Sequence, residues 1–114
     1  MFYHYSQNNS GGSFTSPAIH VIIEAKSARE ANDKAESIGL YFNGVFEGFD
    51  CDCCGDRWST AYDGDEKPDI YGQSPFEYVS KYGSWATDKI PFAVIHYLDG
   101  TVKTIEKEKV EKTY

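Results

Sequence analysis

The sequence predicts an α+β fold with one domain and a mainly antiparallel sheet. A β-rich run at residues 18–25 leads directly into a capped helix, and residues 91–106 have the pattern of a hairpin. Between them, residues 47–74 are rich in turn-forming residues and form a long irregular central segment. The chain has 114 residues, which suits a single core. We expect the domain to span residues 1–106, with a main helix and a short second helix on one face of the sheet, and residues 107–114 to form a charged tail.

The N-terminal part of the chain contains two predicted strands. Residues 2–6 alternate aromatic and polar side chains, which indicates a short strand. In the second strand, residues 18–25, one face is apolar, whereas the other carries His20, Ile22 and Glu24. We expect that second, half-polar face to be partly exposed.

A helix follows the second strand. Ser27 and Glu30 have the spacing of a capping box, in which the serine oxygen accepts a backbone N–H and the glutamate reaches back. Gly39 is a natural left-handed stop. Small apolar side chains line one narrow face of this helix: Ala28, Ala31, Ala35 and Ile38.

The C-terminal half begins with a proline that favours a helix start. Pro75 predicts the short second helix over residues 76–82. In the hairpin, Asp99 and Gly100 match the preferred pair of a two-residue type I′ turn. That turn would place His96 opposite Lys103.

The charge of the chain is concentrated in the middle. The net charge is −7, and residues 47–69 contain eight acidic and two basic residues. Such a segment repels nucleic acid and anionic membranes and attracts a basic surface. No apolar run is long enough for a membrane helix, and residues 1–16 lack the pattern of a secretory leader. We therefore expect a cytoplasmic protein that binds neither nucleic acid directly nor a membrane.

The most unusual stretch is Phe49–Trp58, which contains all three cysteines: Cys51, Cys53 and Cys54. Zinc is an alternative here, but structural zinc sites normally pair cysteines from two segments. An EF-hand reading of the aspartates fails because Ala61 stands where a bidentate glutamate is needed. The acidic flanks disfavour a cysteine nucleophile, since they raise the thiol pKa. We therefore predict no catalytic residue, no metal and no cofactor.

Two candidate binding sites remain. The residue types typical of interface hot spots predict a partner-binding surface that consists of Asp50, Asp52, Asp56, Arg57, Trp58, Tyr62, Asp63 and Asp65. The alternative is that Arg57 pairs with a neighbouring aspartate and Trp58 anchors the segment in the core. A polar loop could also cradle a phosphate of a small molecule, such as a nucleotide signal, with its backbone N–H groups: Asn8, Asn9, Ser10, Gly11 and Gly12.

Three blocks of the sequence carry a family resemblance: the QNNSGG loop, the strand and helix VIIEAKSAREANDKAESIGLYFNG, and DCDCCGDRW. Together they resemble a family of small proteins of unassigned function encoded by tailed bacteriophages, over roughly the first 60 residues. The resemblance implies expression in a bacterial host cytoplasm and supplies no catalytic or ligand residues. We expect a non-enzymatic accessory protein that inhibits or redirects a host factor with a basic surface, as in host takeover or counter-defence. The alternatives are a protein that sequesters a nucleotide signal and a cysteine-based zinc module.

Overall fold

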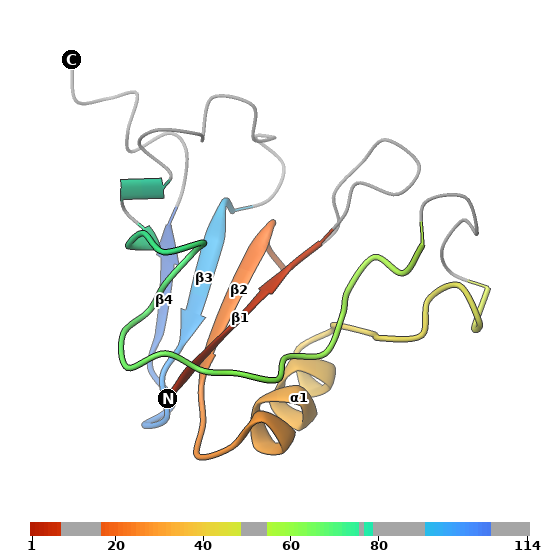
Figure 1. Ribbon diagram of the computed structural model, residues 1–114, viewed down its shortest axis with the longest axis horizontal. Coiled ribbons are helices and arrows are strands. Elements are labelled where there is room, and N and C mark those ends of the chain that lie inside the picture. Colours follow the sequence, from red (N-terminus) through yellow and green to blue (C-terminus); the bar gives the residue numbers. More distant parts are fainter. Residues whose placement is uncertain (8–16, 49–54, 76, 79–90, 106–114) are drawn as a thin grey trace.

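The computed structural model describes residues 1–7, 17–48, 55–75, 77–78 and 91–105. These residues form a four-stranded sheet in the order β1-β2-β3-β4 and one helix, α1 (Figure 1). The strands are β1 (Phe2–Ser6), β2 (His20–Glu24), β3 (Ala93–His96) and β4 (Val102–Ile105), and the helix is α1 (Ala28–Ser37). The pairs β1–β2 and β3–β4 are antiparallel, whereas β2–β3 is parallel. The predicted α+β class and mainly antiparallel sheet are confirmed.

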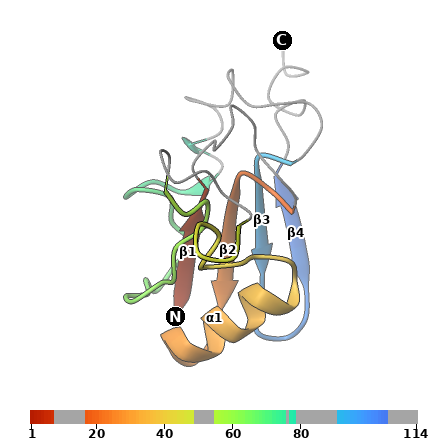
Figure 2. The ribbon, with the colours of Figure 1, turned by 90° about the vertical axis from the view of Figure 1, so that its right-hand side faces the viewer.

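The sheet has a buried cluster on each face because its side chains alternate in direction. On the first face, Tyr5 and Val21 pack with Ala31 and Ala35 of α1. In Figure 2, α1 lies in front of the sheet. On the opposite face, Ile22 and Ile95 belong to a second cluster. Both faces of the sheet are therefore covered.

The second cluster buries more of the half-polar face of β2 than expected, and the expected partial exposure is confined to Glu24, which is half-buried. His20 is 4% exposed and Ile22 is 0% exposed. Ile70 of the central segment belongs to this cluster, and Tyr78 packs against it. The cover comes from a segment far away in sequence, so the alternation within β2 could not reveal it.

The helix begins and ends where the sequence predicts. The Ser27 hydroxyl accepts from the backbone N–H of Glu30 at 3.2 Å, and the Glu30 carboxylate accepts from the N–H of Lys26 at 3.2 Å. At the C-terminal end, Gly39 has φ +110°, and the N–H of Leu40 donates to the carbonyl of Ala35 at 3.0 Å. This is a Schellman motif, which pairs the last carbonyls of the helix.

The predicted second helix is described only in part. Pro75, Glu77 and Tyr78 have helical backbone, and residues 79–82 lie outside the described residues. Tyr78 packs on the cluster opposite α1. The expectation that both helices cover the same face is therefore wrong for the described turn.

The hairpin is present, but its register is shifted by one residue. His96 lies opposite Val102, not opposite Lys103. A type I′ turn needs positive φ at both central residues, whereas only Gly100 has it, at +93°. The loop is longer: the N–H of Tyr97 donates to the carbonyl of Thr101 at 2.8 Å, which leaves three residues in the loop. The left-handed glycine completes a G1 bulge.

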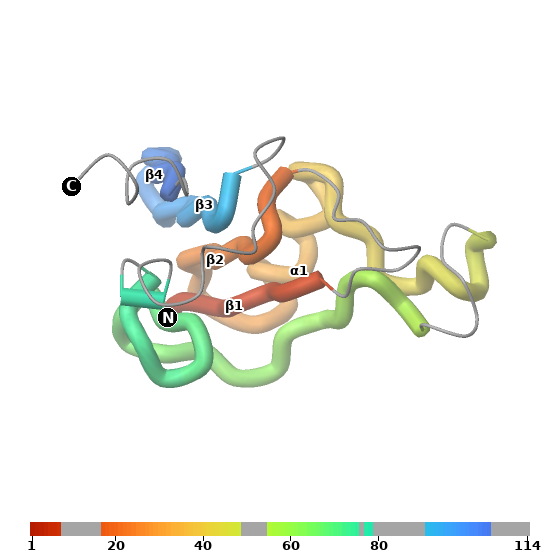
Figure 3. Tube along the Cα trace, turned by 90° about the horizontal axis from the view of Figure 1, so that it is seen from above, coloured from red at the N-terminus to blue at the C-terminus, as the bar shows by residue number. Residues whose placement is uncertain are grey.

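The central segment runs along the outer side of β1, as Figure 3 shows. Asp65 and Phe2 exchange two backbone hydrogen bonds, at 2.7 and 2.9 Å, so the segment covers part of this sheet edge. The Asn32 side chain on α1 holds the segment from the other side, because its amide bonds both the N–H and the carbonyl of Ala61, at 3.0 and 3.3 Å. Its oxygen also accepts from the hydroxyl of Tyr5 at 2.7 Å. The irregular segment is thus fixed to both the sheet and the helix.

Candidate functional site

Most of the described acidic residues between positions 47 and 69 are exposed. The exposed ones are Glu47, Asp56, Asp63, Asp65 and Glu66, and Asp69 is half-buried. We call these six residues the acidic segment. Tyr62, within the same stretch, is 83% exposed. The predicted residues Asp56, Tyr62, Asp63 and Asp65 are therefore exposed, although the Asp56 carboxylate also has partners within the chain, and Asp50 and Asp52 lie outside the described residues.

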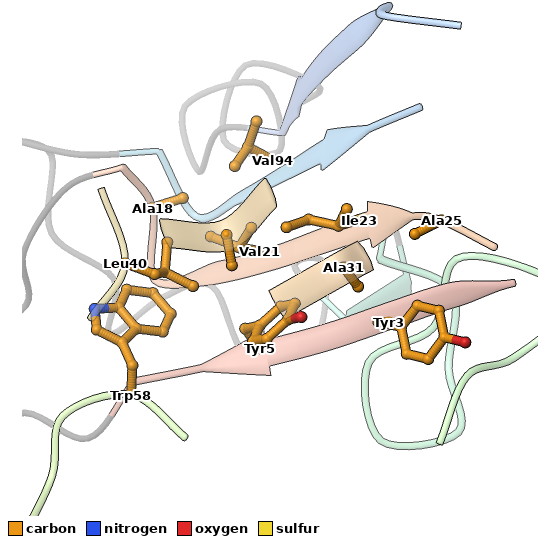
Figure 4. Packing of buried hydrophobic residues seen from close by; sticks show 11 residues of the cluster. Tyr3, Tyr5, Ala18, Val21, Ile23, Ala25, Ala31, Leu40, Trp58 and Val94 are labelled. Carbon is orange, nitrogen blue, oxygen red and sulfur yellow. The ribbon is translucent and has the colours of Figure 1, made fainter. Parts of the chain in front are cut away.

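Trp58 is not part of that surface. Its side chain is 0% exposed and lies in the cluster on the α1 face, beside Leu40 (Figure 4). Its indole N–H has no hydrogen-bond partner among the described residues. The prediction that Trp58 is a partner-binding anchor is wrong, because a large aromatic side chain gains more from burial in the core of a small domain than from solvent. The alternative reading, in which Trp58 anchors the segment, is confirmed.

Arg57 is also turned inward. It is 7% exposed, and its guanidinium donates to the side-chain oxygen of Gln7 at 3.1 Å. Gln7 in turn donates to the carbonyl of Ala18 at 2.8 Å. The prediction that Arg57 reaches a partner is wrong, since its charge serves to join the end of β1 to the central segment. With this cation buried, Lys67 is the exposed base in the described part of residues 47–69.

A turn that the sequence analysis left undefined carries the most exposed aromatic ring among the described residues. Phe46 is 90% exposed. The turn closes through a hydrogen bond from the N–H of Glu47 to the carbonyl of Asn43 at 2.8 Å. The carboxylate of Asp56 fixes it further by accepting from the N–H of Val45 at 3.0 Å. The glycines on both sides of Phe46 in sequence were the available signal for a tight turn.

A groove of about 410 Å³ lies between this turn and the end of α1. Its lining residues combine carboxylates, rings and neutral polar groups: Glu36, Tyr41, Phe42, Asn43, Glu47 and Thr60. None of these side chains is cationic. The Phe42 ring packs against the first cluster, with its centroid 6.0 Å from that of Tyr5, so one wall is fixed to the core.

A pair of histidines, His4 half-buried and His20 buried, forms a separate cluster on the opposite face. His4 Nε2 and His20 Nδ1 are 3.0 Å apart, and the rings stack with centroids 5.1 Å apart. Tyr71 stands edge-on to His4 at 5.2 Å, and its hydroxyl is 2.9 Å from that of Ser6. Tyr71 has φ +51°, which is unusual for a residue with a bulky side chain. The sequence analysis missed this pair because its contact depends on how β1 and β2 pair.

Burial determines the charge of these histidines. It lowers the pKa of His4 to about 4, and the nearby Asp69 opposes that shift. It lowers the pKa of His20 to about 3, and His4 adds to the effect. Both rings are therefore neutral at pH 7, and an N–H of one ring donates a hydrogen bond to the unprotonated nitrogen of the other. His20 Nε2 has no hydrogen-bond partner among the described residues, and the Tyr78 ring stands edge-on 5.4 Å away.

A smaller cleft of about 180 Å³ lies at the carboxyl ends of β2 and β3. It includes His96, whose pKa is lowered by burial and by Lys34. Glu24, another lining residue, is committed to the hairpin because it accepts from the N–H of Leu98 at 3.0 Å. The cleft is small beside the 300–1,000 Å³ typical of ligand pockets.

Several predictions concern residues that the structure does not describe. The polar loop Asn8, Asn9, Ser10, Gly11 and Gly12 and the cysteines Cys51, Cys53 and Cys54 lie outside the described residues. Within the described ranges, no group of three or more His, Cys, Asp or Glu side chains could hold a metal ion. Among these same residues, none of the helical structure is long and apolar enough to cross a membrane.

Residues 1–113 match a family described as a domain of unknown function (DUF7296), and the chain belongs to this family. No curated protein matches the chain significantly, and no solved structure does.

Proposed function

We propose that this chain is a non-enzymatic binding protein whose acidic segment docks on a basic surface of a partner protein. The observation that carries the proposal is the opposite placement of charges in residues 47–69. The described carboxylates are exposed, or half-buried in the case of Asp69, whereas Arg57 is buried. The surface of the segment is therefore more negative than its sequence indicates.

The way the segment is held supports a role in recognition. Trp58 and Ile70 are buried on opposite faces of the sheet, and Asp65 pairs with β1 between them. Tyr62, Asp63, Asp65 and Glu66 are therefore carried on backbone that the core holds at both ends. A fixed surface loses less conformational entropy on binding than a free loop does. Exposed Phe46 and Tyr62 add aromatic contact area of the kind found at interfaces.

The resemblance to small proteins of tailed bacteriophages suggests the class of partner. We propose a bacterial host protein with a cationic surface, such as a nucleic-acid enzyme whose phosphate-binding groove the carboxylates would occupy. Binding would inhibit or redirect that host factor in the host cytoplasm. Charge complementarity of this kind accelerates association and weakens as salt rises.

The test is capture of host proteins by the full chain compared with two charge variants. Asp63→Asn with Asp65→Asn removes two charges from the acidic segment, and Asp33→Asn with Glu77→Gln removes two exposed charges elsewhere. We expect a basic host protein to be retained at low salt by the natural chain and by the second variant, and to be depleted with the first. The dissociation constant for the identified partner should rise with salt. Equal capture by both variants, or an affinity that salt does not change, would overturn the proposal.

A further inference from the structure

We infer that the groove at the C-terminal end of α1 receives an arginine side chain of the basic partner. The inference rests on the proposed function and makes it specific, because it assigns a site and a residue type to the contact. The groove lies at the start of the acidic segment, with Glu47 belonging to both.

The carboxylates of the groove are available for a cation. Glu36 and Glu47 are exposed, and neither side chain has an ion-pair or hydrogen-bond partner in the part of the chain that the structure describes. They come from different elements, the last turn of α1 and the turn after it. The C-terminal end of a helix adds a partial negative charge. The potential in the groove therefore favours a cation over an anion or a neutral group.

The rings of the groove favour a flat cation. Tyr41 and Phe42 are half-buried and pack against the first cluster, so parts of both rings are held in place while the rest faces the groove. A guanidinium group stacks on an aromatic ring and can hold a carboxylate through two parallel hydrogen bonds. An ammonium group forms point contacts and is more strongly hydrated, so it gains less from such a site.

The size of the groove also fits one extended side chain. Its volume of about 410 Å³ exceeds that of a single arginine side chain and is open to solvent, so the partner's backbone can remain outside. Asn43 and Thr60 provide neutral polar groups at the wall. Phe46, next to Glu47 in sequence and 90% exposed, offers an apolar contact for the chain that carries the arginine.

The experiment uses the full chain and two short peptides, one of alternating arginine and glycine and one of alternating lysine and glycine. Affinity is measured by calorimetry, and the binding position is mapped by backbone amide NMR shifts. The groove variant is Glu36→Gln with Glu47→Gln, and the matched control is again Asp33→Asn with Glu77→Gln, which removes the same charge from exposed positions. Far-UV circular dichroism verifies that each variant is folded.

We expect the arginine peptide to bind more tightly than the lysine peptide and to shift amides around residues 36, 41–43, 47 and 60. The groove variant should lose about tenfold in affinity, or about 1.4 kcal/mol, which lies within the range expected for two exposed ion pairs. The control should lose at most about twofold.

Three results would overturn the inference: no binding of the arginine peptide, equal affinity for both peptides, or equal losses in the groove variant and the control. The proposed function has a separate readout, which is capture of a host protein that depends on Asp63 and Asp65. If a host protein is still captured but the groove variant binds the arginine peptide as tightly as the control does, only the arginine site is refuted. If the full chain captures no host protein in a salt-dependent way, the proposed function itself is refuted.

Discussion

Replacement of Trp58 tests whether the acidic segment is anchored in the core. The side chain is 0% exposed, and an indole buries about 200 Å² of mostly apolar surface. At about 25 cal/mol per Å² this area corresponds to about 5 kcal/mol, and substitutions of buried large aromatics by alanine cost about 3–5 kcal/mol. We expect Trp58→Ala to lower the free energy of unfolding by about 3–5 kcal/mol, which is a large part of the 5–15 kcal/mol typical of a small domain.

The assay is urea unfolding near neutral pH, followed by far-UV circular dichroism. Trp58→Phe keeps much of the packing, and the loss of an indole N–H that has no partner among the described residues is not a cost. The smaller ring leaves some space unfilled, so this variant should lower the free energy of unfolding by only about 1–2 kcal/mol. This milder variant keeps the test open if the alanine variant does not fold. Tyr62→Ala is the matched control, because that ring is 83% exposed and its loss should change stability by less than about 0.5 kcal/mol. Equal effects of Trp58→Ala and Tyr62→Ala would refute the buried anchor.

Three further predictions concern the contacts that hold the central segment and the histidine pair. Asn32→Ala removes the three hydrogen bonds of this amide and should lower the free energy of unfolding by about 2–3 kcal/mol in the same assay. Asp33→Ala changes an exposed neighbour and is the control, which should have little effect. Gly64→Ala should cost about 1–3 kcal/mol, because the added methyl group would lie 2.8 Å from a side-chain atom of the first residue; an unchanged urea midpoint would contradict this packing. The pKa values of His4 and His20 are lowered to about 4 and about 3. As the pH falls below about 6.5, both rings therefore become protonated in the unfolded chain while they stay neutral in the folded chain. The contribution of the pair to stability should therefore be fully present above about pH 7 and should fall between about pH 7 and pH 4 by an amount of the order of 6 kcal/mol, about half from each ring. Ring pKa values near 6.5 in an NMR titration would show that the pair is not buried.

The parts of the fold that the sequence predicts correctly depend on neighbouring residues. The first strand is confirmed over Phe2–Ser6. The helix begins after Ser27 and stops at Gly39, because a serine hydroxyl and a left-handed glycine satisfy the helix ends locally. The same holds for its buried face, since Ala31 and Ala35 follow the helical period.

The parts that it predicts incorrectly depend on the geometry of a loop, on distant residues, or on residue types that have two common roles. The predicted register of the hairpin is wrong because the loop has three residues and one positive φ, whereas the type I′ turn has two residues that both need it. Within this loop the N–H of Thr101 donates to the Asp99 carboxylate at 2.9 Å. His20 was expected on a half-exposed face, but Ile70, far along the chain, contributes to its cover. Arg57 and Trp58 are residue types that serve interfaces and cores equally well, so composition could not separate the two roles.

The burial of Arg57 and Trp58 removes two of the predicted contacts and leaves carboxylates as most of the exposed charge of residues 47–69. Trp58 and Ile70 are buried at the two ends of the stretch that carries Asp63 and Asp65. The carboxylates on this stretch are like charges and repel one another. Such repulsion opposes folding, and a domain of this size has little stability to lose. A basic partner relieves this repulsion by placing cations among the carboxylates, and the relief contributes to the free energy of binding. Neutralising Asp63 and Asp65 should accordingly leave the fold at least as stable while weakening the partner contact, a combination that a purely structural role for these carboxylates does not produce.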